Sequence, residues 1–148
     1  MQVRTEIEID APPEEVWNVL ADFGAYRDWN PFIVRVDGKL TVGARLTVTI
    51  SPPESREMTF KPVVLTVEPG NEIRWRGHFV AAKLFQGEHF FRLTPSREGQ
   101  TRFVHGEDFS GVLLKMLGPA LTQTARGFVL MNQALKRRVE ARGHSAAR

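Results

Sequence analysis

The chain has 148 residues, which is enough for one domain with a substantial core and too few for two ordinary domains. Apolar residues make up 42% of the sequence and charged residues 25%, values that exclude disordered and fibrous classes. The absence of cysteine excludes disulfides, thiol nucleophiles and thiolate metal sites. The net charge is only +3, and the excess of basic residues lies near the C-terminus. Basic residues in the last turns of a helix complement its dipole, so this excess does not indicate a nucleic-acid partner, and we expect none.

No apolar run is long enough to cross a bilayer, so we expect no stable membrane insertion. The first ten residues alternate between charged and apolar types and do not form the apolar core of a signal peptide. We therefore expect a cytoplasmic protein, as a monomer or a homodimer.

The N-terminal part predicts one strand followed by two short helices. Residues 3–9 alternate cleanly between apolar and polar side chains, as in a half-buried strand. The segment 10–15 is typical of a helix start, because it combines prolines in the first turn with two glutamates, and this helix should end near Ala21. Further helical turns are expected within 23–28, before Trp29-Asn30-Pro31 returns the chain to extended geometry.

The middle of the chain predicts six more strands separated by turn residues such as Asp37-Gly38 and Pro69-Gly70-Asn71. The predicted strands are 32–37, 44–51, 57–68, 72–80, 84–94 and 100–109. No segment between them has helical spacing, so the strands are expected to pair antiparallel in one continuous sheet.

Everything after Gly111 has the period of a helix. Apolar residues recur at intervals of three, four and seven: Leu117, Leu121, Phe128, Met131, Leu135 and Val139. Because Gly118-Pro119 interrupts the pattern, we expect a helical lead-in at 112–117 and a main helix at 119–142. The single domain should span 1–142, with 143–148 as a tail.

This order of elements predicts the α+β class with a helix-grip architecture. A seven-stranded curved antiparallel sheet would wrap around the long C-terminal helix, with two short helices after the first strand. The apolar faces of sheet and helix would then enclose a cavity.

The last three predicted strands share an aromatic inner face. Period two places these residues on one side: Trp75, Gly77, His89, Phe91, Leu93, Phe103, His105, Glu107 and Phe109. The matching register sets Trp75 beside His89 and His89 beside His105. Gly77 and Gly87 are expected to leave room for a ligand on this face.

Four segments, at 9–23, 26–32, 68–77 and 131–136, resemble the SRPBCC superfamily. These START-type, helix-grip proteins include polyketide cyclase/dehydrase-like members, birch-pollen-allergen-like carriers and coenzyme-Q-binding proteins. The resemblance implies a deep hydrophobic pocket for a lipid, a polyketide or another small apolar molecule. It does not decide between a carrier and an enzyme, because the superfamily contains both and has no shared catalytic signature.

Two functions therefore remain open. The first is a carrier or sensor of a small hydrophobic molecule, in which the two histidines satisfy each other inside the core. The second is a cyclase or dehydratase that uses His105 and His89 as acid–base groups, with Glu107 as a further candidate. These three residues have the side-chain types of a two-histidine, one-carboxylate iron site. An alternating strand spaces them too widely for such a site, so we expect no metal and no cofactor.

The candidate ligand contacts lie on the inward faces of the strands and of the final helix, and after the second short helix. They are Trp29, Phe32, Trp75, Gly77, Phe85, His89, Phe91, His105, Phe109, Met116, Leu121, Phe128 and Met131. Their aromatic and methionine character suits a flat or variable apolar ligand.

Overall fold

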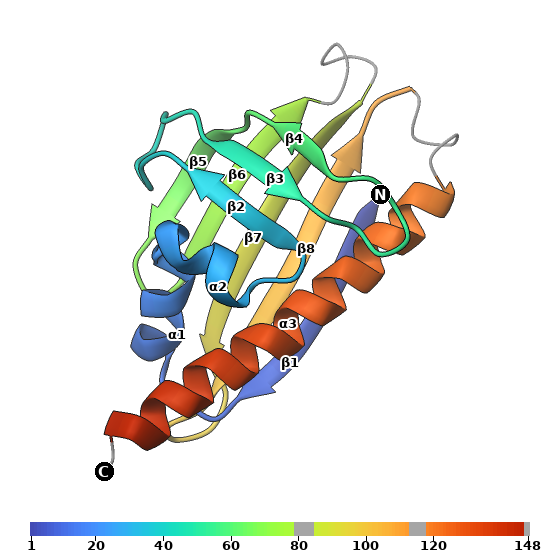
Figure 1. Ribbon diagram of the computed structural model, residues 1–148. Helices are drawn as coiled ribbons and strands as arrows, with labels where there is room; N and C mark the ends of the chain where they lie inside the picture. Colours follow the sequence, from blue (N-terminus) through green and yellow to red (C-terminus); the bar gives the residue numbers. More distant parts are fainter. Residues whose placement is uncertain (79–84, 113–117, 147–148) are drawn as a thin grey trace.

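The computed structural model describes residues 1–78, 85–112 and 118–146, which form an α+β fold (Figure 1). The strands in these residues are β1 (Gln2–Ile9), β2 (Ile33–Asp37), β3 (Thr47–Ile50), β4 (Met58–Phe60), β5 (Val63–Glu68), β6 (Glu72–His78), β7 (Gln86–Pro95) and β8 (Thr101–Ser110). The helices are α1 (Pro13–Ala21), the 3₁₀ turn η1 (Phe23–Ala25), α2 (Tyr26–Trp29) and α3 (Gly118–Ala146).

The described strands form two antiparallel sheets, so the prediction of a single seven-stranded sheet is wrong. One sheet has the order β1-β8-β7-β6-β5 and the other the order β2-β3-β4. The predicted strand 57–68 breaks into β4 and β5 at Pro62, which has no backbone N–H to donate. Val48 pairs with Phe60 and Arg45 with Val63 in one register, so the break interrupts a single long hairpin.

The short helices follow the predicted signals closely. Pro13 occupies the first turn of α1, and Glu14 and Glu15 lie at the positive end of its dipole. After α2, the Asn30 side-chain oxygen accepts hydrogen bonds from the backbone N–H groups of Phe32, at 3.0 Å, and Ile33, at 2.8 Å. The Trp-Asn-Pro segment is therefore a side-chain-capped turn that leads the chain into β2.

The helix α3 runs diagonally across the five-stranded sheet, in front of β8 and β1 (Figure 1). Its predicted apolar stripe is buried at Leu121, Phe128, Met131, Leu135 and Val139. The helix continues to Ala146, past the predicted end at 142, so part of the predicted tail is helical. The predicted lead-in falls largely at 113–117, outside the described residues. In the described part of the chain, no helix is long and apolar enough to cross a membrane.

A glycine in α3 brings the helix close to the chain that enters β2. A Cβ atom at Gly127 would overlap the ring of Phe32, and Phe32 is buried against this point of the helix. The Phe32 ring also packs edge-on against the ring of Phe128, with 5.6 Å between centroids. The absence of a side chain at Gly127 therefore sets the depth at which Phe32 packs.

We predict that Gly127→Ala lowers the free energy of unfolding by about 1–3 kcal/mol, because the added methyl group overlaps the Phe32 ring. The matched control is Gly143→Ala in the same helix, where the nearest atom to a new Cβ is Glu15 Oε2 at 3.7 Å. This control should stabilise the protein by up to about 1 kcal/mol through helix propensity. Urea unfolding measures both changes, and equal effects of the two substitutions would contradict the packing argument.

Candidate functional site

The inner face of β6, β7 and β8 carries the predicted aromatic and polar side chains. Trp75 pairs with His89 across β6 and β7, as predicted, and the two rings stack at 5.1 Å. The backbone partner of His89 on β8 is Glu107, whereas His105 pairs with Phe91. The two histidines are therefore diagonal neighbours rather than direct partners. The predicted register between β7 and β8 is wrong by two residues.

Five polar side chains, here named the polar chain, form a continuous series of hydrogen bonds: Glu107, His89, His105, Asn132 and Thr5. Glu107 Oε1 lies 3.4 Å from His89 Nδ1, a long contact, and His89 Nε2 lies 2.9 Å from His105 Nε2. His105 Nδ1 lies 2.9 Å from Asn132 Oδ1. Asn132 Nδ2 donates to Thr5 Oγ1 at 2.8 Å, and Thr5 donates to the His105 carbonyl at 2.9 Å.

The direction of each hydrogen bond in the polar chain follows from Thr5. Its one hydroxyl proton goes to the His105 carbonyl, so the Thr5 oxygen accepts from the amide of Asn132. Asn132 therefore turns its oxygen toward His105, whose Nδ1 must carry a proton. A neutral His105 accepts at Nε2, so His89 donates from Nε2 and presents a lone pair on Nδ1. Glu107 completes the series only when its carboxyl is protonated.

Burial favours the neutral form of all three titratable members. Burial raises the pKa of Glu107 to about 8, and the neighbouring Asp108 carboxylate adds to the rise. Burial lowers the pKa of His89 to about 3. Burial and the proximity of His89 hold the pKa of His105 well below its ordinary value, although its hydrogen bond to Asn132 acts in the opposite direction. At neutral pH the His89–Glu107 contact is thus a neutral hydrogen bond and not an ion pair.

Exposure decreases along the polar chain from Glu107 to His105. The exposed fractions are 7% for Glu107, 5% for His89 and 0% for His105. His105 also stacks on Phe128 at 3.9 Å, and both of its nitrogens have protein partners. Glu107 Oε2, in contrast, has no hydrogen-bond partner within the described residues. Glu107 is therefore the member best placed to meet another molecule.

The space above the two inner-face glycines is filled by side chains of this protein, contrary to prediction. A Cβ atom at Gly87 would meet Glu107 Oε2 and lie 3.3 Å from the Phe109 ring. A Cβ atom at Gly77 would lie 3.2 Å from the Phe60 ring. These glycines accommodate Glu107, Phe109 and Phe60, so they do not by themselves form the floor of an empty cavity.

Most other candidate contact residues lie in one buried cluster. The buried members are Phe32, Trp75, Phe85, Phe91, Phe109, Leu121, Phe128 and Met131. Trp29 is half-buried against this cluster, and Met116 lies outside the described residues. Phe85 and Phe109 stack with 5.5 Å between centroids beside Gly87, close in sequence to the segment 79–84 that is not described. The Trp75 Nε1 donor is buried without a partner in the described part of the chain.

Sequence reasoning missed Asn132 and Thr5 as members of the polar chain. Asn132 lies four residues after Phe128, so helical spacing places an amide on the apolar face of α3. A buried amide needs hydrogen-bond partners, and this signal could have identified Asn132 as a partner for a buried histidine. No comparable signal marks Thr5, because threonine is common in strands.

The described residues contain no group of three or more histidine, aspartate or glutamate side chains placed to hold a metal ion. The nitrogens that could have coordinated one are engaged in the polar chain.

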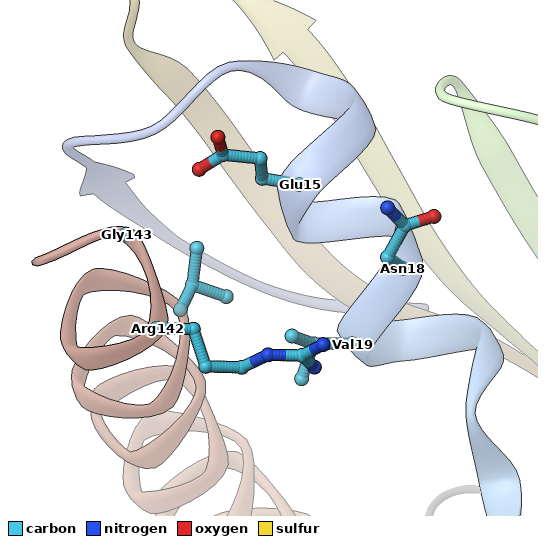
Figure 2. Close-up of a pocket in the computed structure, with 6 residues that line it drawn as sticks. Glu15, Asn18, Val19, Arg142 and Gly143 are labelled. Atoms are coloured by element: carbon cyan, nitrogen blue, oxygen red, sulfur yellow. The ribbon is translucent and has the colours of Figure 1, made fainter. Parts of the chain in front are cut away.

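A pocket of about 170 Å³ lies away from the polar chain, between α1 and the C-terminal part of α3. Figure 2 shows Glu15 and Asn18 on the α1 side, and the Arg142 side chain extends from α3 toward Val19 of α1. The pocket is a surface feature at the junction of two helices, and it does not open onto His89 or Glu107.

The raised pKa of Glu107 predicts a fall in stability between pH 6.5 and 8. Below pH 4.5, its ordinary pKa, the carboxyl is protonated in the folded and unfolded states; between 4.5 and about 8 only the unfolded chain loses the proton. The two histidines act in the opposite sense but only below their ordinary pKa of 6.5. From pH 6.5 to 8, Glu107 should thus lower the free energy of unfolding by about 2 kcal/mol.

Replacing Glu107 with Gln should remove this fall, because the amide donates to His89 and does not titrate. The control is Glu98→Gln in the exposed turn between β7 and β8, which should leave the slope unchanged. Urea unfolding at pH 6.5, 7.2 and 8 measures the effect. The assignment of a protonated Glu107 fails if Glu107→Gln shows the same slope as the unmodified protein.

Comparisons with known proteins agree with this architecture. The crystal structure of the Zhui aromatase/cyclase from Streptomyces sp. R1128 has a TM-score of 0.81 at 18% identity, covering 99% of this chain and 97% of that one. A START superfamily protein from Mycobacterium smegmatis has a TM-score of 0.73 at 20% identity, covering 95% and 97%. Protein MLL2253 from Mesorhizobium loti has a TM-score of 0.64 at 26% identity, covering 93% and 98%.

A comparison with curated protein sequences found no match. The match to a sequence family, in contrast, covers residues 1–141, nearly the whole chain, and it confirms the resemblance seen in the N-terminal and Trp-Asn-Pro segments. The chain belongs to the family described as polyketide cyclase / dehydrase and lipid transport.

Proposed function

We propose that this protein binds a small, mostly apolar molecule carrying a hydroxyl group between the five-stranded sheet and α3, as a carrier or sensor. The family described above includes both cyclases and lipid-transport proteins, and it supports a ligand-binding or cyclase-type role. The chemistry of Glu107 and its surroundings supports the narrower proposal.

The observation that carries the proposal is the neutral carboxyl at the outer end of the polar chain. Its proton is directed from Oε1 to His89 Nδ1, so Oε2 is left as a carbonyl-type acceptor. No hydrogen bond is made to this oxygen within the described residues, and it is not one of their fully buried unpaired atoms, so a donor from another molecule can reach it. A ligand hydroxyl would donate to Oε2 and satisfy it without disturbing the rest of the polar chain.

The surroundings of Glu107 favour an apolar, aromatic-like ligand body. Phe85 and Phe109 stack beside Gly87, and Trp75 stacks on His89. Flat aromatic faces attract flat or polyunsaturated ligands by dispersion and by offset stacking. The site would therefore combine one polar anchor with a mostly apolar wall, the usual composition of small-molecule sites.

A second candidate function is favoured by the same protonated carboxyl. A group with a pKa near 8 is a competent general acid at neutral pH. In a dehydration, the carboxyl of Glu107 would turn its proton from His89 Nδ1 to a departing hydroxyl, the C–O bond would break to release water, and the carboxylate would take a proton from the adjacent carbon. His89 and His105 would act as positioning residues, because the nitrogens of His105 are engaged by protein partners.

The binding proposal predicts a preference for probes with a hydroxyl donor. We expect 2-naphthol to bind at least about fivefold more tightly than 2-methoxynaphthalene, because only naphthol donates to Glu107 Oε2. Glu107→Leu should remove this preference and leave the affinity for 2-methoxynaphthalene nearly unchanged. Fluorescence titration at pH 6.5 measures both dissociation constants.

The matched control for this experiment is Glu98→Leu in the exposed turn between β7 and β8, which should keep the preference for naphthol. Glu107→Gln retains a carbonyl acceptor and should keep most of it. The role of Glu107 is wrong if Glu107→Leu binds the two naphthalenes with the same ratio as the unmodified protein.

The enzymatic candidate is separated from the carrier by turnover. A dehydratase should convert 4-hydroxy-4-phenylbutan-2-one to its conjugated enone, seen as a rise in ultraviolet absorbance, and Glu107→Gln should reduce kcat by about 100-fold or more. No conversion above the rate in buffer, together with naphthol binding, would leave the carrier as the function.

A further inference from the structure

The strand β1 forms one edge of the five-stranded sheet, with β8 as its neighbour. The backbone N–H of Phe109 donates to the Met1 carbonyl, and the Met1 amino group donates to the Phe109 carbonyl. This pair shows which residues of β1 are hydrogen-bonded to β8. Odd-numbered residues of β1 therefore direct their N–H and C=O groups to β8, and even-numbered residues direct theirs to the open edge. The hydrogen bond from Lys136 Nζ to the Glu8 carbonyl, on the open side, agrees with this pattern.

The helix α3 covers only the C-terminal end of this edge. Lys136 bonds the carbonyl of Glu8, and Glu140 accepts from the backbone N–H of Asp10. In the described part of the chain, no hydrogen bond reaches the outward backbone groups of Gln2, Arg4 and Glu6. An open strand edge of this kind is a template for pairing with another strand.

The side chains along this edge are complementary to a second copy of the same strand. In antiparallel pairing about a two-fold axis at Thr5, Arg4 faces the Glu6 position of the other copy, and the symmetry repeats the contact. Gln2 would face Glu8, whose outward carbonyl is already bound by Lys136, so the backbone pairing is confined to Arg4 and Glu6 on either side of the axis. Within one copy, Arg4 Nη2 lies 3.3 Å from Glu6 Oε2, and both side chains are about half exposed, at 54% and 53%, so the same two charges can also pair across the axis. Opposite charges directly across a strand pair are stabilising, and this register creates two such pairs.

An apolar groove lies beside the same point of the strand. Its volume is about 440 Å³, and it is lined by Thr5 of β1 and by one flank of α3 that includes Ala125, Val129 and Leu130. Val129 and Leu130 are each 43% exposed, which is unusual for large aliphatic side chains on a helix packed against a sheet. A second copy placed on the axis at Thr5 would bring its own α3 flank to this groove.

We infer that the protein forms a homodimer through antiparallel pairing of two β1 strands about Thr5, with the α3 flanks at Val129 and Leu130 in contact across the axis. The inference does not rest on the proposed function, since it uses the open edge of β1 and the flank of α3 and needs no ligand at Glu107. The pairing satisfies the open backbone groups of Arg4 and Glu6, places their opposite charges across the axis and covers the groove.

A charge swap tests the register. Arg4→Glu and Glu6→Arg each place two like-charged pairs across the axis and should raise the dimer dissociation constant about tenfold or more. The double variant Arg4→Glu/Glu6→Arg restores both pairs and should return the constant to within about threefold of the original. Sedimentation velocity over a concentration series measures association, and thermal melts confirm that each variant is folded.

Cysteine cross-linking tests the geometry directly, because the chain has no cysteine of its own. In this register Thr5 faces its own copy at a non-hydrogen-bonded position, where Cβ atoms are close enough for a disulfide. Thr5→Cys should thus form a disulfide-linked dimer on mild oxidation, and a thermal melt of the reduced variant checks that it folds without the Thr5 hydroxyl. Gln2→Cys, whose partner in this pairing is Glu8, should remain largely unlinked.

The α3 flank has a matched control in the loop before β3. Val129→Lys should weaken the dimer about tenfold or more, whereas Val42→Lys, at a position 61% exposed, should have no effect. The inference is overturned if the unmodified protein is monomeric at 100 µM or above, or if it dimerises but the single charge variants leave the constant unchanged. A Gln2→Cys cross-link as efficient as that of Thr5→Cys would also exclude this register.

Discussion

The fixed direction of hydrogen bonding from Thr5 to Glu107 is the constraint on which the interior of this protein depends. Each member of the polar chain has its donors and acceptors assigned by the next, and the members come from β1, β7, β8 and α3. Leaving any one of them unpaired would cost about 1–3 kcal/mol, because the groups are buried. The position of α3 on the sheet is therefore specified by polar contacts as well as by the apolar stripe around Phe128.

The secondary structure was predictable where the signal is local. Strict alternation placed Trp75, His89 and His105 on the inner face, and prolines with the first-turn glutamates located α1 and the return to extended geometry at Asn30. The break at Pro62 was missed, since alternation continues on both sides of it and only the pairing of β3 with β4 and of β5 with β6 reveals two sheets. Alternation along a strand shows which face of the sheet a side chain is on. It does not show which neighbouring strand the backbone is hydrogen-bonded to.

The site was less predictable than the fold because its essential contacts are distant in sequence. Asn132 and Thr5 are 127 residues apart, so no window of sequence contains both. Gly87 was predicted to leave space for a ligand from the alternation of its own strand alone. In the structure, the Glu107 side chain of the neighbouring strand fills the space beside Gly87. An inner-face glycine shows only that something needs space there, and a side chain of the same protein meets that need as well as a ligand does.

The outer face of the sheet is covered next to the polar chain, as the inner face is. Gly106 has no side chain, and the Phe90 ring occupies its outer surface. The guanidinium groups of Arg74 and Arg92 lie over that ring, 4.7 and 5.1 Å from its centroid. Water is thereby kept from both faces of β7 and β8 next to the polar chain. Because a carboxylate needs water or a cation to stay charged, the burial of Glu107, with the neighbouring charge of Asp108, keeps the proton on it at neutral pH.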